Sequence, residues 1–185
     1  MKKGIILIII LFFFQLVTYS QNLENLDSKY RFNKFKLEST YQSYSKDLDF
    51  VLDDKSTGVK FYNYTKKDIS IFGFTDIKQL VLGFYKNKLY NISITLGPTS
   101  DENTYKIILS KLKELFGYPT LVTSGSDKYG NEDYRTYMEN VNQWVTNKTT
   151  LGLNKVKCNS IINPCSISIF LVSEKIGRQI SNDGF

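Results

Sequence analysis

Two stretches of alternating apolar and polar residues stand close together near the middle of the chain. The first runs from Leu80 to Tyr85 and the second from Tyr90 to Leu96. A period of two, with β-branched and aromatic residues on one side, is typical of half-buried strands. The short polar segment between the two stretches predicts that they form a β-hairpin.

The apolar faces of the two strands determine how they pair, because a slip of one residue turns every side chain to the other face. A three-residue loop, 86–88, sets Leu82 opposite Ile92 and joins the two apolar faces. A two-residue loop, 87–88, would set Leu82 opposite Ser93. We therefore prefer the three-residue loop, with Asn87 or Lys88 in the left-handed region at a bulge.

An amphipathic helix follows the hairpin. Thr99 and Glu102 have the spacing of a capping box, although Ser100 or Asp101 is an alternative cap. Gly117 and Pro119 are typical of a helix end. One apolar stripe has helical spacing and favours packing on the hairpin; its members are Tyr105, Ile108, Leu109, Leu112, Leu115 and Phe116.

The remaining pattern predicts further strands and one more helix. A second helix is expected to begin near Tyr41 and to reach Leu48 or beyond. A two-residue turn at 147–148 would set Trp144 opposite Leu151. Strands are expected at 59–64, 69–74, 120–123 and 166–172, and residues 134–138 and 141–146 are expected to form one strand or two interrupted ones. The predicted fold class is α+β: a single mainly antiparallel sheet with two helices packed on one face.

The N-terminus predicts export. Two lysines precede an apolar run from Gly4 to Phe14, and small residues stand before Gln21. This is the pattern of a cleaved signal peptide over residues 1–20, and the apolar run is too short for a stable membrane span. Cleavage removes two lysines and lowers the formal net charge from +6 to about +4. We expect a secreted or periplasmic bacterial protein.

The mature chain, 21–185, has the length of one exported domain, with its ends at 21–29 and 174–185 expected to be loose. Its only cysteines, Cys158 and Cys165, are an even pair close in sequence. In an oxidising compartment such a pair predicts a disulfide bond. A zinc site would need further ligands and a different cysteine spacing.

Composition limits the catalytic chemistry. The chain has no histidine, so neither a Ser-His-Asp nor a Cys-His arrangement can form. Asp47, Asp49, Asp53 and Asp54 form an acidic cluster that would suit a small glycan-directed hydrolase with paired carboxylates. Such an enzyme also needs a sugar cleft lined by aromatic residues, which Tyr41, Tyr44, Tyr62 and Tyr64 would supply. The alternative interpretation is structural: the four aspartates cap turns and face solvent.

The loop 124–133 contains Asp127, Asn131 and Asp133, whose oxygens are of the kind that calcium prefers, but their order is not that of a known calcium loop. No glycine-rich phosphate-binding sequence occurs, so we predict no cofactor. The lysines are spread along the chain, which argues against nucleic acid as a partner.

Several segments together resemble a recurring pattern in small exported bacterial proteins of uncharacterised function. They are the segment after FKLEST, the hairpin LVLGFYKNKLYNISI, the helix ending LFGYP, the Trp144 strand and SISIFLV. At the level of the fold the chain also resembles outer-membrane assembly lipoproteins and β-lactamase-inhibitor-type repeats, but it lacks the lipidated cysteine of the lipoproteins. The resemblance implies a helix followed by a strand meander and carries no function.

The leading functional hypothesis is a non-enzymatic binding or envelope-associated module whose partner is an unknown protein or an envelope polymer. With two helices on one face, the other face of the sheet is expected to be partly exposed. The residues expected at a binding surface there, together with those of the adjacent loop, are Tyr85, Leu89, Ser93, Asp127 and Tyr129.

Overall fold

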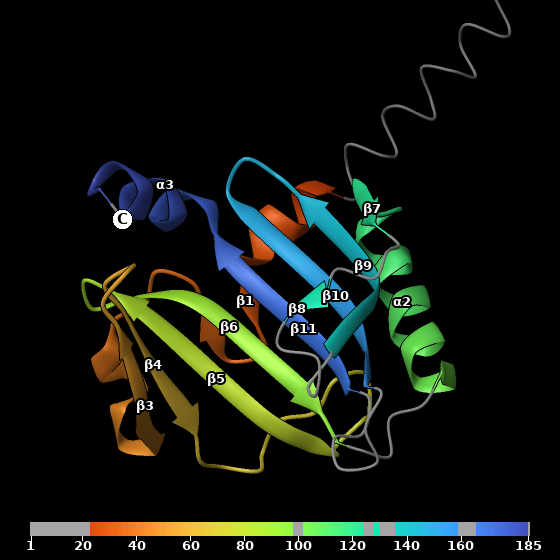
Figure 1. The fold of residues 1–185 in the computed structure, drawn as a ribbon, viewed down its shortest axis with the longest axis horizontal. Coiled ribbons are helices and arrows are strands. Elements are labelled where there is room, and N and C mark those ends of the chain that lie inside the picture. Colours follow the sequence, from red (N-terminus) through yellow and green to blue (C-terminus); the bar gives the residue numbers. More distant parts are fainter. Residues whose placement is uncertain (1–22, 98–101, 124–127, 130–135, 159–165, 185) are drawn as a thin grey trace, which may run out of the picture.

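The computed structural model describes residues 23–97, 102–123, 128–129, 136–158 and 166–184. Within these residues the fold is α+β, built on one nine-stranded sheet whose strand pairs are all antiparallel (Figure 1). The main path of the sheet has the order β3-β4-β5-β6-β11-β10-β9-β7, and β8 pairs with β9. A separate two-stranded sheet joins β1 and β2.

The elements follow one another in two strand meanders joined by a helix. The first half contains a helical turn at 23–29, then β1 (Arg31–Phe32), β2 (Phe35–Lys36), the 3₁₀ turns η1 (Tyr41–Ser43) and η2 (Ser45–Asp47), β3 (Leu48–Asp54), β4 (Val59–Tyr64), β5 (Ile77–Tyr85) and β6 (Lys88–Leu96). The second half contains α2 (Glu102–Phe116), β7 (Leu121–Thr123), β8 (Lys128–Tyr129), β9 (Thr136–Val145), β10 (Thr149–Cys158), β11 (Ser166–Ser173) and α3 (Glu174–Asn182).

One face of the sheet carries the main core. The buried side of α2 packs there, as does the N-terminal segment through Leu26, Phe35 and Leu37. Trp144 is fully buried in this core, and its indole N–H donates to the carbonyl of Gly117 at 2.8 Å. Gly117 has a φ of 77°, as expected at the left-handed end of a helix. The predicted apolar stripe and C-terminal end of α2 are therefore confirmed.

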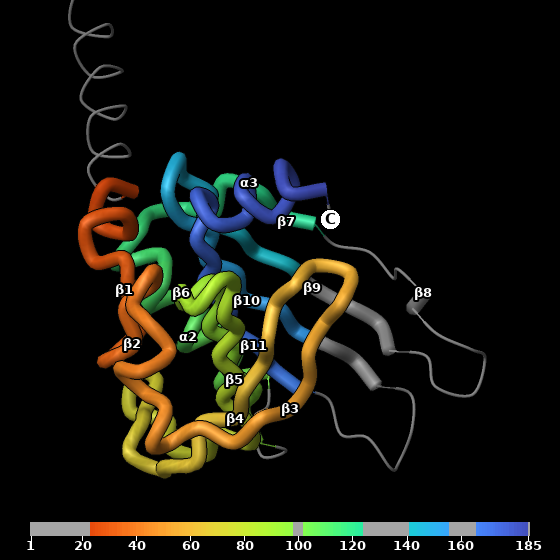
Figure 2. The backbone as a smooth tube through the Cα atoms, turned by 90° about the vertical axis from the view of Figure 1, so that its left-hand side faces the viewer, coloured from red at the N-terminus to blue at the C-terminus, as the bar shows by residue number. Residues whose placement is uncertain are grey.

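The opposite face is covered at one end by α3. Ile176 and Ile180 pack against Val59 and Tyr85, in a cluster separate from the main core. In the side view of Figure 2, the N-terminal segment lies to the left of the central strands and α3 caps their upper end. The expectation that the helices share one face is not confirmed, because α3 packs in a cluster separate from that of α2, and the C-terminal segment expected to be loose is this helix.

The sequence-based strand pattern is confirmed at several points and corrected at others. The strand at 59–64, the pairing of Leu82 with Ile92, and that of Trp144 with Leu151 are observed. The expected helix from Tyr41 is instead two 3₁₀ turns that lead into β3. The segment 69–74 forms only one isolated bridge, whereas 23–29, expected to be frayed, is helical with Leu26 buried.

The central hairpin has the predicted pairing but a different turn. Lys86 and Asn87 both have positive φ values, 45° and 67°, and Tyr85 pairs with Lys88 around them. This is the geometry of a two-residue hairpin turn. The pairing shifts between Gly83 and Phe84, so the extra residue lies in the strands as a bulge and not in the loop.

Candidate functional site

A pocket of about 380 Å³ opens where the turn between β5 and β6 meets β4 and η1. We call it the aromatic pocket; its lining residues are Tyr41, Gly58, Lys60, Tyr62, Phe84, Lys86 and Asn87. The volume lies in the lower part of the range of roughly 300–1,000 Å³ found for small-molecule sites. The pocket brings together three aromatic rings, two ammonium groups and one amide.

The turn between β5 and β6 places η1 over the sheet. The backbone N–H of Tyr41 donates to the carbonyl of Asn87 at 3.1 Å. The side-chain amide of Asn87 donates to the Oε1 atom of Gln42 at 3.0 Å. Because Asn87 is held in the left-handed region, its carbonyl and side chain both face η1. These two bonds fix Tyr41 beside the pocket.

The three rings contact one another. The centroid of Tyr41 lies 4.9 Å from that of Tyr62 and 5.5 Å from that of Phe84, and Tyr62 and Phe84 are 5.8 Å apart. The two contacts with Phe84 are edge-on, an arrangement that aromatic rings favour. Phe50 extends this group outwards, 5.7 Å from Tyr62, with 61% of its surface exposed. The result is an apolar wall whose outer members, Tyr41, Tyr62 and Phe50, reach solvent.

The charge at the rim is positive. Lys60 lines the pocket and is exposed, and Lys86 pairs with Asp183 of the segment after α3 at 2.7 Å. The hydrogen bond to Asp183 raises the pKa of Lys86. Burial, followed by the nearby Tyr41 and Asp53, raises the pKa of Tyr62. Neither group therefore changes its charge between about pH 5 and pH 9.

Two of the residues expected at an exposed binding surface are buried. Tyr85 is 3% exposed beneath α3, and its hydroxyl donates to Asp183. Leu89 is fully buried on the side of the main core. The expectation that Tyr85 and Leu89 share an exposed face is therefore wrong, because the bulge in this hairpin changes which side Leu89 faces and α3 covers Tyr85.

The three remaining residues expected at the binding surface are Ser93, Tyr129 and Asp127. Ser93 is half-buried on the face opposite the main core. Tyr129 belongs to β8, which pairs with β9. Asp127 lies outside the described residues, as do the other oxygen ligands considered for calcium in the loop 124–133.

Three members of the acidic cluster are engaged with their neighbours. Asp47 pairs with Lys66 at 3.5 Å and Asp53 with Lys55 at 2.5 Å. Asp54 accepts from the backbone N–H of Ser56 at 2.9 Å and closes the turn after β3. Hydrogen bonds from side chains in that turn, Ser56 first, lower the pKa of Asp54.

The four tyrosines considered for a sugar cleft divide into two pairs. Tyr41 and Tyr62 meet in the aromatic pocket. Tyr44 and Tyr64 instead pack on the buried ring of Phe35, at 5.3 and 5.0 Å. The structure thus brings together half of the aromatic set that the sequence suggested.

Sequence reasoning did not find the two lysines or Phe84 as pocket residues. Lys60 and Phe84 come from paired strands and Lys86 from the adjoining turn, so they meet only once the sheet has formed. The one local signal was the pair Lys86-Asn87 between two strands, which predicts a tight turn but not what the turn contacts.

Among the described residues, no group of three or more metal-ligating side chains lies together. Cys165 lies outside these residues, and so does the predicted signal segment at 1–20. Across the same described ranges, no helix has the length and apolar character needed to cross a membrane. Comparison with family models, with curated proteins and with solved structures gave no match for this chain.

Proposed function

We propose that this protein is an exported, non-enzymatic binding module that holds an acidic polysaccharide of the cell envelope in the aromatic pocket. The observation that supports this most directly is the wall formed by Tyr41, Tyr62 and Phe84 beneath a rim carrying Lys60 and Lys86. A sugar acid combines the two features that such a site complements, an apolar ring face and a carboxylate.

The rings are suited to stacking against a sugar. The carbon-bound hydrogens on one face of a pyranose are weakly polar and pack against aromatic rings by dispersion. Tyr62 and Tyr41 are half-buried, so each has ring surface left for a ligand. Because contacts among the rings and with the sheet already hold them in place, binding costs little side-chain entropy.

The ammonium groups favour an anionic sugar over a neutral one. Lys60 and Lys86 are both exposed at the rim, and an opposite charge on the ligand would gain a charge-assisted hydrogen bond there. Asp183 neutralises part of the charge of Lys86, at 2.7 Å, which leaves Lys60 as the principal partner for a carboxylate.

The alternative, a small glycan-directed hydrolase, needs two carboxylates facing each other across the sugar. Of the acidic cluster, Asp47, Asp53 and Asp54 bond to their neighbours, and Asp49 stands exposed on β3. The described lining of the pocket carries ammonium groups instead. We therefore favour binding over hydrolysis.

The test is calorimetric titration of the mature protein with a galacturonate tetrasaccharide and with a neutral galactose tetrasaccharide. The charged probe is expected to bind, and Tyr62→Ala to weaken it by roughly tenfold or more, as for a central aromatic contact. Lys60→Gln should reduce the preference for the charged probe. Tyr118→Ala, at a tyrosine that is 69% exposed, is the matched control.

Equal binding of both probes would remove the argument from Lys60. Absence of binding by the charged probe, or unchanged binding by the Tyr62 variant, would reject the pocket as a saccharide site. Release of shorter sugars from the charged probe would revive the hydrolase. The export part of the proposal is tested by intact mass of the protein from the envelope or the medium, which should correspond to a chain beginning near Gln21.

A further inference from the structure

The outer edge of β3 is a free sheet edge within the described part of the chain. The main path of the sheet ends at β3, which pairs with β4 on its inner side. β3 has seven residues, Leu48–Asp54, and so is about 23 Å long. A free edge offers unpaired backbone N–H and C=O groups to another extended segment. The position of β3 therefore allows a further strand to be added.

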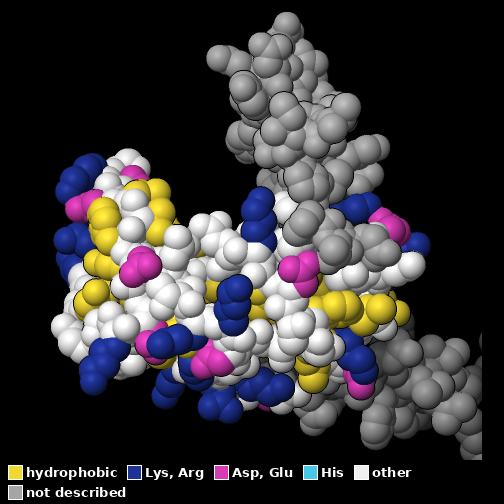
Figure 3. All heavy atoms as spheres, turned by 90° about the horizontal axis from the view of Figure 1, so that it is seen from below, with side chains coloured by type: hydrophobic (Ala, Val, Ile, Leu, Met, Phe, Trp, Pro, Cys, Tyr) yellow, Lys and Arg dark blue, Asp and Glu magenta, His cyan; other side chains and the backbone are white. Residues whose placement is uncertain are grey.

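The side chains of β3 are unusually apolar for an exposed edge. Phe50, Val51 and Leu52 are consecutive and are 61%, 39% and 46% exposed. In Figure 3, hydrophobic side chains run along the projecting β3–β4 hairpin at the left, with charged groups beside them. A run of exposed apolar residues on an edge strand marks an interaction site more often than an isolated exposed residue does.

The charges within β3 argue against a second copy of this chain as the occupant. A two-fold antiparallel pair centred on Val51 would place Asp49 opposite Asp53 in both halves of the pair. Like charges directly opposite each other destabilise a strand pair.

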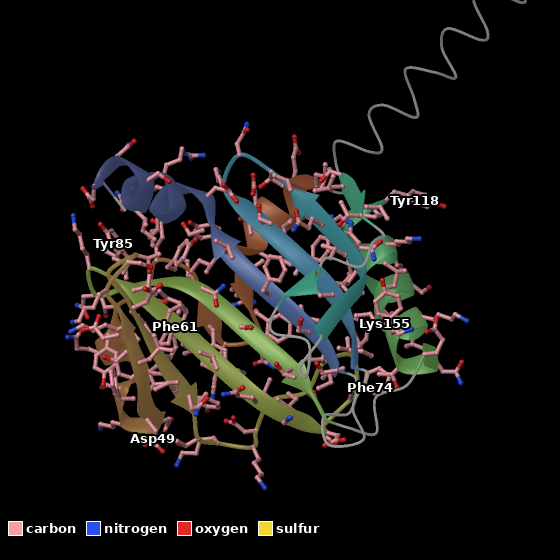
Figure 4. The ribbon with its side chains drawn as sticks, in the orientation of Figure 1. Asp49, Phe61, Phe74, Tyr85, Tyr118 and Lys155 are labelled. Carbon is pink, nitrogen blue, oxygen red and sulfur yellow. The ribbon has the colours of Figure 1, made fainter. Side chains whose placement is uncertain are left out.

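The same charges favour a basic partner. β3 contains three carboxylates, Asp49, Asp53 and Asp54, and no cation. Asp53 already pairs with Lys55, and Asp54 closes the turn. Asp49 is exposed near the lower end of β3 (Figure 4) and is the carboxylate best placed to meet an incoming cation.

We propose that the β3 edge binds an extended, lysine- or arginine-bearing segment of a partner protein as an additional strand of the sheet. Backbone hydrogen bonds to β3 would supply affinity, and apolar side chains on one face of the segment would cover Phe50. A cation opposite Asp49 would fix the register. This protein-binding edge is separate from the saccharide site and does not depend on it.

The test uses three fluorescein-labelled, capped heptapeptides and the mature protein. The first is Lys-Thr-Val-Thr-Val-Thr-Lys, the second has Glu at both ends, and the third keeps both lysines but has proline at its centre. We expect the first to raise fluorescence anisotropy on titration and to slow amide exchange in β3. The second should bind at least tenfold more weakly because its charges repel Asp49. The third should fail because proline interrupts the strand ladder.

Two variants of the protein complete the design. Asp49→Lys should reverse the preference, so that the Glu peptide binds better than the Lys peptide. Glu24→Lys makes the same charge change at an exposed residue of the helical segment 23–29, outside β3, and should leave the preference unaltered. Because Asp49 and Glu24 are both exposed, we expect both variants to fold, and far-UV circular dichroism checks this.

Three results would overturn the proposal. The first is equal binding of the Lys and Glu peptides, and the second is binding of the proline peptide as tight as that of the Lys peptide. The third is failure of the Lys peptide to slow amide exchange in β3. Sedimentation that shows a dimer of the protein with protected β3 amides would assign the edge to a second copy instead. None of these results depends on whether the aromatic pocket binds sugar.

Discussion

Replacing Trp144 with phenylalanine tests how β9 and α2 are held together. Trp144 is fully buried, and its indole N–H donates to the carbonyl of Gly117, just beyond the end of α2. Phenylalanine keeps an aromatic ring in the core but removes the donor and part of the volume. The change therefore affects one hydrogen bond and one packing contact without altering the fold.

Two effects contribute to the expected loss of stability. A residual cavity of roughly 30–40 Å³, at about 24 cal/mol per Å³, costs about 1 kcal/mol. Loss of the donor leaves the Gly117 carbonyl without its protein partner, which costs about 1 kcal/mol because Gly117 is half-buried and water reaches part of it. The sum is about 2 kcal/mol, or a fall in Tm of roughly 4–8 °C for a chain of this length.

Urea unfolding followed by far-UV circular dichroism measures the effect. Tryptophan fluorescence cannot serve, because Trp144 is the only tryptophan in the chain. Tyr118→Phe, next to Gly117 but 69% exposed, is the control and should change the free energy of unfolding by less than about 0.5 kcal/mol. A loss below about 0.5 kcal/mol for Trp144→Phe, with an unchanged dependence on urea, would refute the reasoning.

Three further predictions concern the packing of β10 against β11, the helix α3 and the two cysteines. Gly152→Ala should destabilise the sheet by roughly 1–3 kcal/mol, because an added Cβ would collide with the ring of Phe170. Urea unfolding should show a much smaller cost when the same change is made in a Phe170→Ala background. Hydrogen bonds, from Lys86 first, lower the pKa of the Asp183 carboxyl from its ordinary value of 3.8. The contact of Asp183 with Lys86 and Tyr85 therefore stabilises α3 above that ordinary value, and this stabilisation is lost as the pH falls through the lowered pKa. Asp183→Asn should therefore speed amide exchange in α3 at pH 7, with a difference from wild type that shrinks as the pH falls below the ordinary range of a carboxyl. Thiol titration of the denatured, oxidised protein should find no free sulfhydryl, and two free thiols would contradict the proposed bond between Cys158 and Cys165.

The parts of the fold that the sequence predicted are those determined by local patterns. α2 has a long apolar stripe and a Gly-x-Pro end, and the two hairpins have matched apolar faces around short polar turns. The segment from Tyr41 was misread because residues three apart face the same way in both α-helices and 3₁₀ turns. The ring of Tyr44 packs on Phe35, a contact that spacing alone does not reveal.

α3 was missed although its signals are present. Ser173 accepts from the backbone N–H of Ile176 as an N-cap, and Ile176 and Ile180 are one turn apart. With only two apolar residues in a polar segment, the pattern resembles a loose tail. The aromatic pocket could not be predicted for another reason: its lining residues come from η1, β4, β5 and the β5–β6 turn, which are separated in sequence and meet only in the folded chain.

The position of β11 has a consequence for the order in which the chain becomes able to fold. β11 is the last strand in the sequence, yet it lies between β6 and β10 and joins the two meanders. A nascent chain that ends before residue 166 therefore leaves the edges of β6 and β10 that face β11 unpaired. Strand pairs distant in sequence form late and slowly. The two halves can therefore join into one sheet only after β11 has been made, so a chain held at the ribosome or delivered through a narrow channel does not complete this sheet until residues 166–173 are free.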